Sequence, residues 1–257
     1  MGLKFLYELE KVNMRAAYAL KASFYIQIIS MIINNLVFFS VWWIFFERFD
    51  EINGWRLPEL QACYGFACFS FGFSVVFAGG TRDLSRLIVE GGLDSFLTQP
   101  KSPLLHIVAS KSQVSGWGDI ISGLVLISFS GFLNWQTFPL IVIMSLAGGC
   151  VLTAFRLVAH SLGFWLGPVE TLSRQLTEFI ITFSVYPMPL FQMAFRVVLF
   201  TVLPAAFISY VPVMAVKDSS PLFVAIGLLS APVYLYLGRI IFNQGLKSYR
   251  IQGSGPA

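Results

Sequence analysis

Three ionisable side chains interrupt long apolar segments of this sequence, where a charge is costly and therefore informative. Asp119 lies near the start of one such segment, and Arg156 and His160 lie one helical turn apart near the end of the next. Charges inside a membrane commonly mark proton or ion paths, or pair with one another. Because the depths match, an Asp119–Arg156 pair is possible. It would be a relay for protons or substrate, or a structural ion pair, and the pattern favours the structural pair.

Two neighbouring amides, Asn34 and Asn35, lie in the middle of the first long apolar segment. Such amides usually hydrogen-bond to other helices, although they can also line a translocation path. We favour helix packing. The two histidines of the chain, His106 and His160, cannot form a metal site by themselves, so no metal is expected.

Motifs for nucleotide hydrolysis or for common hydrolytic chemistry are missing. The sequence contains no phosphate-binding loop of the Walker type, no HExxH pattern and no GxSxG elbow. Each of these motifs supplies a group that its reaction requires. We therefore do not expect this chain to be an enzyme or to bind a cofactor of its own.

The composition identifies the solvent that the chain faces. Of its 257 residues, 56% are hydrophobic and 12% are charged, whereas soluble domains carry about 25% charged residues. A helix needs about 20 apolar residues to cross the hydrocarbon of a bilayer. The segments that meet or approach this length predict spans at about 22–46, 60–80, 114–133, 138–161, 177–195 and 221–242.

The stretch 179–216 is too long for one crossing, and its only charge is Arg196. Prolines, among them Pro204 and Pro212, interrupt helices. We predict one span followed by a re-entrant hairpin at about 190–216 on the outer side. There Arg196 would contact lipid or substrate phosphates, or anchor the interface.

Charge placement predicts the orientation. Basic residues cluster in the first 21 residues and in the C-terminal tail, so the positive-inside rule places both termini in the cytoplasm and requires an even number of spans. The amphipathic pattern of residues 3–20 predicts a helix lying at the interface. The expected fold is an all-α polytopic membrane protein with six transmembrane helices in a single domain, 1–257.

One cytoplasmic loop, residues 81–113, is much longer than the others. Its apolar residues are spaced as in two short amphipathic helices separated by Gly91-Gly92. Such helices can dock in a groove of a partner protein, or they can pack on the membrane surface. The spacing alone leaves both interpretations open.

The motifs along nearly the whole chain, taken in order, resemble the permease subunit of type-2 ABC transporters, in the bacterial exporter branch. They are Gly54-Trp55, Gly92 to Pro100 with Pro103-Leu104, Gly118-Asp119 with Gly123, Tyr186-Pro187, Leu203 to Pro212, and Phe242 to Tyr249. The resemblance implies that the loop carries a coupling helix that docks on a separate ATP-binding subunit, which uses ATP and magnesium. It assigns the contact to Arg86, Glu90, Leu93, Asp94, Phe96 and Leu97.

The same resemblance implies the assembly and the location. Two permeases, identical or paralogous, would pair with two ATPases in the bacterial inner membrane, with lipid around them and no nucleic acid. The N-terminal helix would lie at the interface, and the re-entrant element would face outward. A competing hypothesis is a self-sufficient secondary transporter or channel that uses Asp119, Arg156 and His160 as a polar relay.

Overall fold

Helices and the turns between them form the whole described part of the chain, residues 2–253 of a computed structural model. A helix satisfies its backbone polar groups internally, which an apolar solvent requires. β-Strands are absent from these residues. The prediction of an all-α polytopic membrane protein is confirmed. Residue 1 and residues 254–257 of the predicted domain 1–257 lie outside the described residues.

Within residues 2–253, four helices are long and apolar enough to cross a membrane. They are α2 (Lys21–Phe46), α3 (Leu57–Phe77), α8 (Phe138–Ser161, continued by α9, Gly163–Leu166) and α13 (Pro221–Gly253). Two helices of 15 residues, α7 (Ser115–Phe129) and α10 (Glu170–Ser184), pack beside them. Because α7 and α10 are shorter than a full span, the prediction of six crossings stays a prediction.

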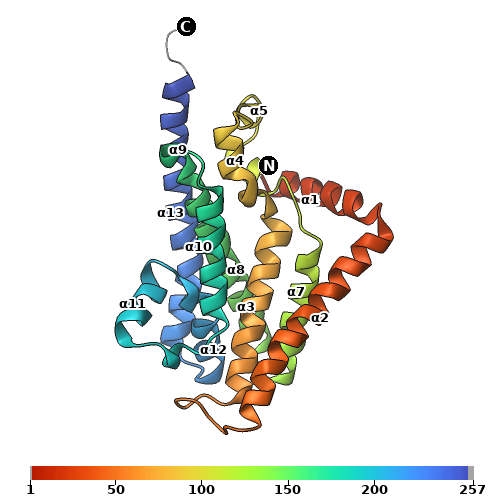
Figure 1. Cartoon of the computed structure of the whole chain (residues 1–257), viewed down its shortest axis with the longest axis vertical. Helices are drawn as coiled ribbons and strands as arrows, with labels where there is room; N and C mark the ends of the chain where they lie inside the picture. Colours follow the sequence, from red (N-terminus) through yellow and green to blue (C-terminus); the bar gives the residue numbers. More distant parts are fainter. Residues whose placement is uncertain (1, 254–257) are drawn as a thin grey trace.

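The two ends of the bundle differ, as Figure 1 shows. One end carries the final turns of α13, the amphipathic helix α1 (Gly2–Tyr18), which runs sideways to the long helices, and the loop between α3 and α7. That loop consists of η1 (Gly79–Asp83), α4 (Leu84–Val89), α5 (Asp94–Leu97) and α6 (Pro103–Val108). Because α1 and the end of α13 lie at the same end, the chain runs through the bundle an even number of times.

The opposite end carries the predicted re-entrant element. It comprises η2 (Met188–Leu190), α11 (Met193–Thr201), η3 (Ala205–Phe207) and α12 (Tyr210–Lys217). The chain bends by 75° between α11 and the segment Ala205–Lys217. Such a bend prevents the two pieces from forming one straight span.

The helix that we predicted at 177–195 has different bounds in the structure. Helix α10 begins at Glu170 and ends at Ser184, so the helix lies earlier in the chain than we predicted. Pro187 and Pro189 follow, and a residue before proline is disfavoured in helical conformation. The re-entrant element accordingly begins at Met188, close to the predicted residue 190.

Glycines allow α3 and α7 to approach closely. Gly65 faces Gly123, and Gly72 faces Gly116, so the two helices meet at two points seven residues apart. A Cβ atom on Gly123 would lie 2.6 Å from the carbonyl oxygen of Gly65. Helices in membranes associate through such small residues because lipid supplies no hydrophobic driving force between them. This contact fixes the start of α7, which carries Asp119.

Candidate functional site

The loop between α3 and α7 folds around a small core of its own. Leu84, Ile88, Leu93 and Ile107 of the loop are buried together with side chains of three helices that lead into the bundle. Those partners are Leu157 of α8, Phe164 of α9 and Phe242 of α13. The loop is therefore attached to the bundle through a packed apolar interface.

The predicted contact residues of this loop separate into two groups. Arg86, Glu90 and Asp94 are exposed, and Phe96 and Leu97 are half-buried. These five side chains leave a surface open at the end of the molecule, where Figure 1 shows α4 and α5 projecting.

Leu93 does not belong to that surface, which corrects its assignment as a contact residue. Its side chain is completely buried. The reason is local: Gly91 has φ +75° and reverses the chain, and the Leu93 N–H then donates to the Leu87 carbonyl at 3.1 Å. Positive φ suits glycine, which has no Cβ.

An apolar side chain that our sequence reasoning missed lies on the open surface instead. Val89 is 50% exposed at the end of α4. Its signal was present in the sequence, because Val89 lies off the face formed by Leu84 and Ile88. We call the exposed residues Arg86, Val89, Glu90 and Asp94 the loop surface.

Asp119 lies on α7 and is buried where this helix packs against α2 and α3. Its Oδ1 accepts a hydrogen bond from Asn35 Nδ2 at 2.8 Å, and its Oδ2 has no partner among the described residues. Asn35 is buried, whereas Asn34 is exposed on the outside of the bundle. Asn35 therefore has the packing role that we favoured, and Asn34 has no contact of that kind.

Arg156 and His160 lie on the other side of α3. The Asp119–Arg156 pair that we considered does not form: among the described residues no ion pair includes either side chain. Arg156 instead donates to the Ser74 hydroxyl at 3.0 Å, while Asp119 packs beside Gly72. Ser74 and Gly72 are two positions apart and so point in directions about 200° apart around the helix.

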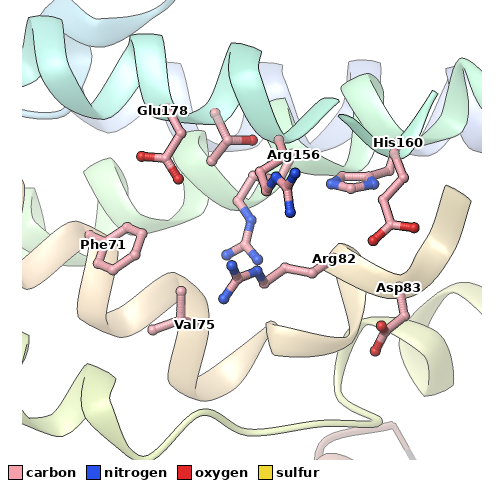
Figure 2. Close-up of a pocket in the computed structure, with 10 residues that line it drawn as sticks. Phe71, Val75, Arg82, Asp83, Arg156, His160 and Glu178 are labelled. Carbon is pink, nitrogen blue, oxygen red and sulfur yellow. The ribbon is translucent and has the colours of Figure 1, made fainter. Parts of the chain in front are cut away.

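Helix α3 thus separates Asp119 from Arg156 and His160, the other two residues of the proposed relay. Arg156 and His160 line one cavity together with Arg82 and Asp83, as Figure 2 shows, and Asp119 does not line it. A relay through all three residues would need a path around α3. The structure brings two of its three members together.

The re-entrant element is held by its own polar contacts. Arg196 donates to the carbonyls of Phe191 at 2.8 Å and Pro189 at 3.1 Å, which braces the turn before α11. Pro204 is buried at the bend, and Pro212 is buried in the first turn of α12, where a missing N–H is tolerated.

Lys217 joins this element to α3. Its Nζ lies 2.9 Å from the carboxylate of Glu59, which also accepts a hydrogen bond from the Arg56 N–H at 3.0 Å. Sequence reasoning singled out neither Glu59 nor Lys217, because nothing in their local sequence relates two residues so far apart.

Within residues 2–253, no group of three or more His, Cys, Asp or Glu side chains could hold a metal ion. The three cysteines are all free, and Cys63 and Cys68 are buried. The candidate site therefore has two parts: the loop surface, and the polar cavity lined by Arg156 and His160.

One comparison with known proteins identifies relatives of this chain. Residues 21–253 match the family described as ABC-2 family transporter protein. This match covers every helix from α2 to α13, including the loop and the re-entrant element. No curated protein matches the chain.

Proposed function

Because this chain belongs to the ABC-2 family of transporter proteins, we propose that it is the membrane-spanning permease of an ATP-driven exporter. A separate ATP-binding subunit docks on the loop 81–113, and the chain itself hydrolyses no nucleotide. A second permease, identical or paralogous, completes the translocation path in the bacterial inner membrane.

The loop surface is the observation that carries this proposal. Arg86, Val89, Glu90 and Asp94 are exposed together beyond the helical bundle, and they offer charge of both signs around one apolar side chain. Beneath them, the buried side chains of the loop pack on α8, α9 and α13. A force applied to this surface is therefore transmitted to helices that run through the bundle, since packed interiors resist compression.

Two outer helices support the pairing with a second permease. In the most apolar stretch of each helix, only 11% of the residues of α2 and 17% of those of α13 are buried, whereas 72% of those of α3 are buried. The faces of α2 and α13 are left for lipid or for another permease. Closure of the ATPase dimer would move the two loops, and the permeases would rock against one another to pass the substrate.

The test is a docking experiment with the full chain. We would co-express it with a candidate ABC ATP-binding subunit, sought among the neighbouring genes, purify the complex through a tag on this chain, and measure ATP hydrolysis in nanodiscs. Val89→Asp and Glu90→Lys are expected to lose the ATPase subunit. The matched control Phe49→Asp places the same charge at an equally exposed site (55%) at the opposite end.

Two results would overturn the proposal. One is a Val89→Asp, Glu90→Lys double variant that retains the ATPase subunit and its stimulated hydrolysis. The other is substrate transport by the purified chain alone, driven by an ion gradient, which would favour the secondary transporter instead.

A further inference from the structure

A cavity of about 160 Å³ lies between α3, η1, α8 and α10, at the same end of the molecule as the loop. Arg156 and His160 form its buried wall, and the exposed residues Arg82 and Arg174 stand at its rim. Figure 2 shows Arg82 and Arg156 reaching into this space from different elements. At about 30 Å³ for each water molecule, the cavity has room for about five.

Arg156 has no counter-ion in the described part of the chain. Its side chain is 1% exposed, its Nη1 donates only to the neutral Ser74 hydroxyl, and its Nη2 has no partner. A guanidinium keeps its charge in proteins, and a buried charge without a partner costs several kcal/mol. A stable fold therefore requires something that offsets this charge.

The carboxylates around the cavity do not fill that role. Asp83 is already paired with Arg86 at 2.8 Å and with Lys111 at 2.5 Å. Glu170 and Glu178 are exposed on α10, and neither forms an ion pair within residues 2–253. Both glutamates line the cavity and repel an anion there, but water and salt screen this repulsion as they screen the attraction of the exposed Arg82 and Arg174, whereas the buried charge of Arg156 is screened much less.

His160 adds a second unsatisfied group to the same wall. It is 3% exposed, and its Nδ1 atom has no hydrogen-bond partner in the described structure. Buried polar atoms are normally hydrogen-bonded, and an exception calls for an explanation. Arg156 and His160 line the same cavity, and each carries one such atom, Nη2 and Nδ1 respectively. A ligand with several acceptor oxygens, reached by a small movement of the two side chains, would give both atoms a partner.

We propose that this cavity binds a phosphoryl group, with Arg156 as its buried ligand and with Arg82 and Arg174 at the rim. Arginine suits this role because its planar fork donates two parallel hydrogen bonds to phosphate oxygens. A phosphomonoester offers three terminal oxygens and a phosphodiester headgroup offers two, and each oxygen accepts more than one hydrogen bond, so several arginines can share the group. The group belongs to a soluble phosphate compound or to a lipid headgroup. The proposal is independent of the docking of an ATP-binding subunit.

Two binding measurements distinguish these sources. In the first, the full chain in a maltoside detergent, which contains no phosphate, is titrated with inorganic phosphate by calorimetry against chloride at equal ionic strength. In the second, the chain is reconstituted in phosphatidylglycerol nanodiscs, and native mass spectrometry records the lipid that it retains. Binding in the first supports a soluble compound, and retention in the second alone supports a headgroup.

Variants connect the binding to the cavity. Arg82→Gln lies at the exposed rim, so the fold is expected to persist, and it should weaken binding about tenfold through one lost charge-assisted hydrogen bond. Arg156→Gln should abolish binding. The control Arg48→Gln removes an exposed arginine at the opposite end and should change nothing. The proposal fails if the wild-type chain binds neither probe, or if Arg82→Gln and Arg174→Gln bind both as the wild type does.

Discussion

Tyr249, near the end of the last helix, donates a hydrogen bond from its hydroxyl to Oδ1 of Asp94 in α5, at 3.1 Å. The two residues are 155 positions apart in the sequence, and Tyr249 also packs against the buried core of the loop. The loop surface is therefore tied directly to α13, which runs the length of the bundle (Figure 1).

Removal of this bond should weaken coupling without preventing assembly. We expect Tyr249→Phe to lower ATP-driven transport about fivefold, which corresponds to about 1 kcal/mol for one hydrogen bond. Asp94→Asn keeps an acceptor at Oδ1 and should retain most activity. The reverse order, with Asp94→Asn impaired and Tyr249→Phe normal, would mean that the charge of Asp94 serves the ATPase subunit directly.

Truncation of Leu93 should lower the stability of the fold, whereas truncation of Val89 should weaken only the binding of the ATPase subunit. Leu93→Ala opens a cavity in the loop core and should cost about 2–5 kcal/mol of stability, measured by thermal unfolding in detergent. Val89→Ala should leave the melting temperature unchanged and weaken the capture of the ATPase subunit. Equal melting temperatures for the two variants would contradict the burial of Leu93.

The buried amide Asn35 should be more important for stability than its neighbour Asn34. Asn35→Leu removes the hydrogen bond that Asn35 donates to Asp119, and a buried acceptor left unsatisfied costs about 1–3 kcal/mol. Asn34→Leu, on the exposed side, should stay within about 0.5 kcal/mol of the wild type. Unfolding curves of the two single variants test this, and Asp119→Leu added to Asn35→Leu should recover part of the loss.

Glu10 should make the attachment of α1 depend on pH. Burial raises the pKa of its carboxyl group above the ordinary value, and the neighbouring polar side chains of Ser112 and Asn13 offset part of that effect. A raised pKa in the folded state means that the protonated form is favoured there, so attachment is strongest at acid pH and weakens as the pH rises through the raised pKa.

Hydrogen exchange of the α1 amides, corrected for its intrinsic pH dependence, measures this effect. Protection should fall between acid and neutral pH in the wild type and in the exposed control Glu8→Gln. In Glu10→Gln the side chain is always neutral, so protection should not change with pH. A wild-type profile as flat as that of Glu10→Gln would refute the role of Glu10.

Much of the fold could be predicted because the bilayer dictates it. Long apolar runs must form helices in an apolar solvent, which is why the segments at 22–46 and 138–161 coincide with α2 and α8. The span at 177–195 was misplaced because hydropathy continues unbroken past Ser184. Only the local backbone restriction before Pro187 decides where that helix ends.

The candidate site could be predicted only in part. Its place in the loop followed from the length and amphipathic spacing of residues 81–113, and its exposed charges were among those that the resemblance indicated. The burial of Leu93 depends on Gly91 and on side chains of α8, α9 and α13. A periodic pattern marks a face as apolar, but it cannot tell whether that face meets the chain itself or a partner.

Asp119, Arg156 and His160 show the same division. The sequence alone determined that three costly polar groups lie in apolar helices at similar depth. The separation of Asp119 from the other two by α3 became visible only in the folded structure, since residues at equal depth can face different neighbours around a bundle. Depth follows from position along the chain, whereas contact depends on the rotation of each helix, which packing sets.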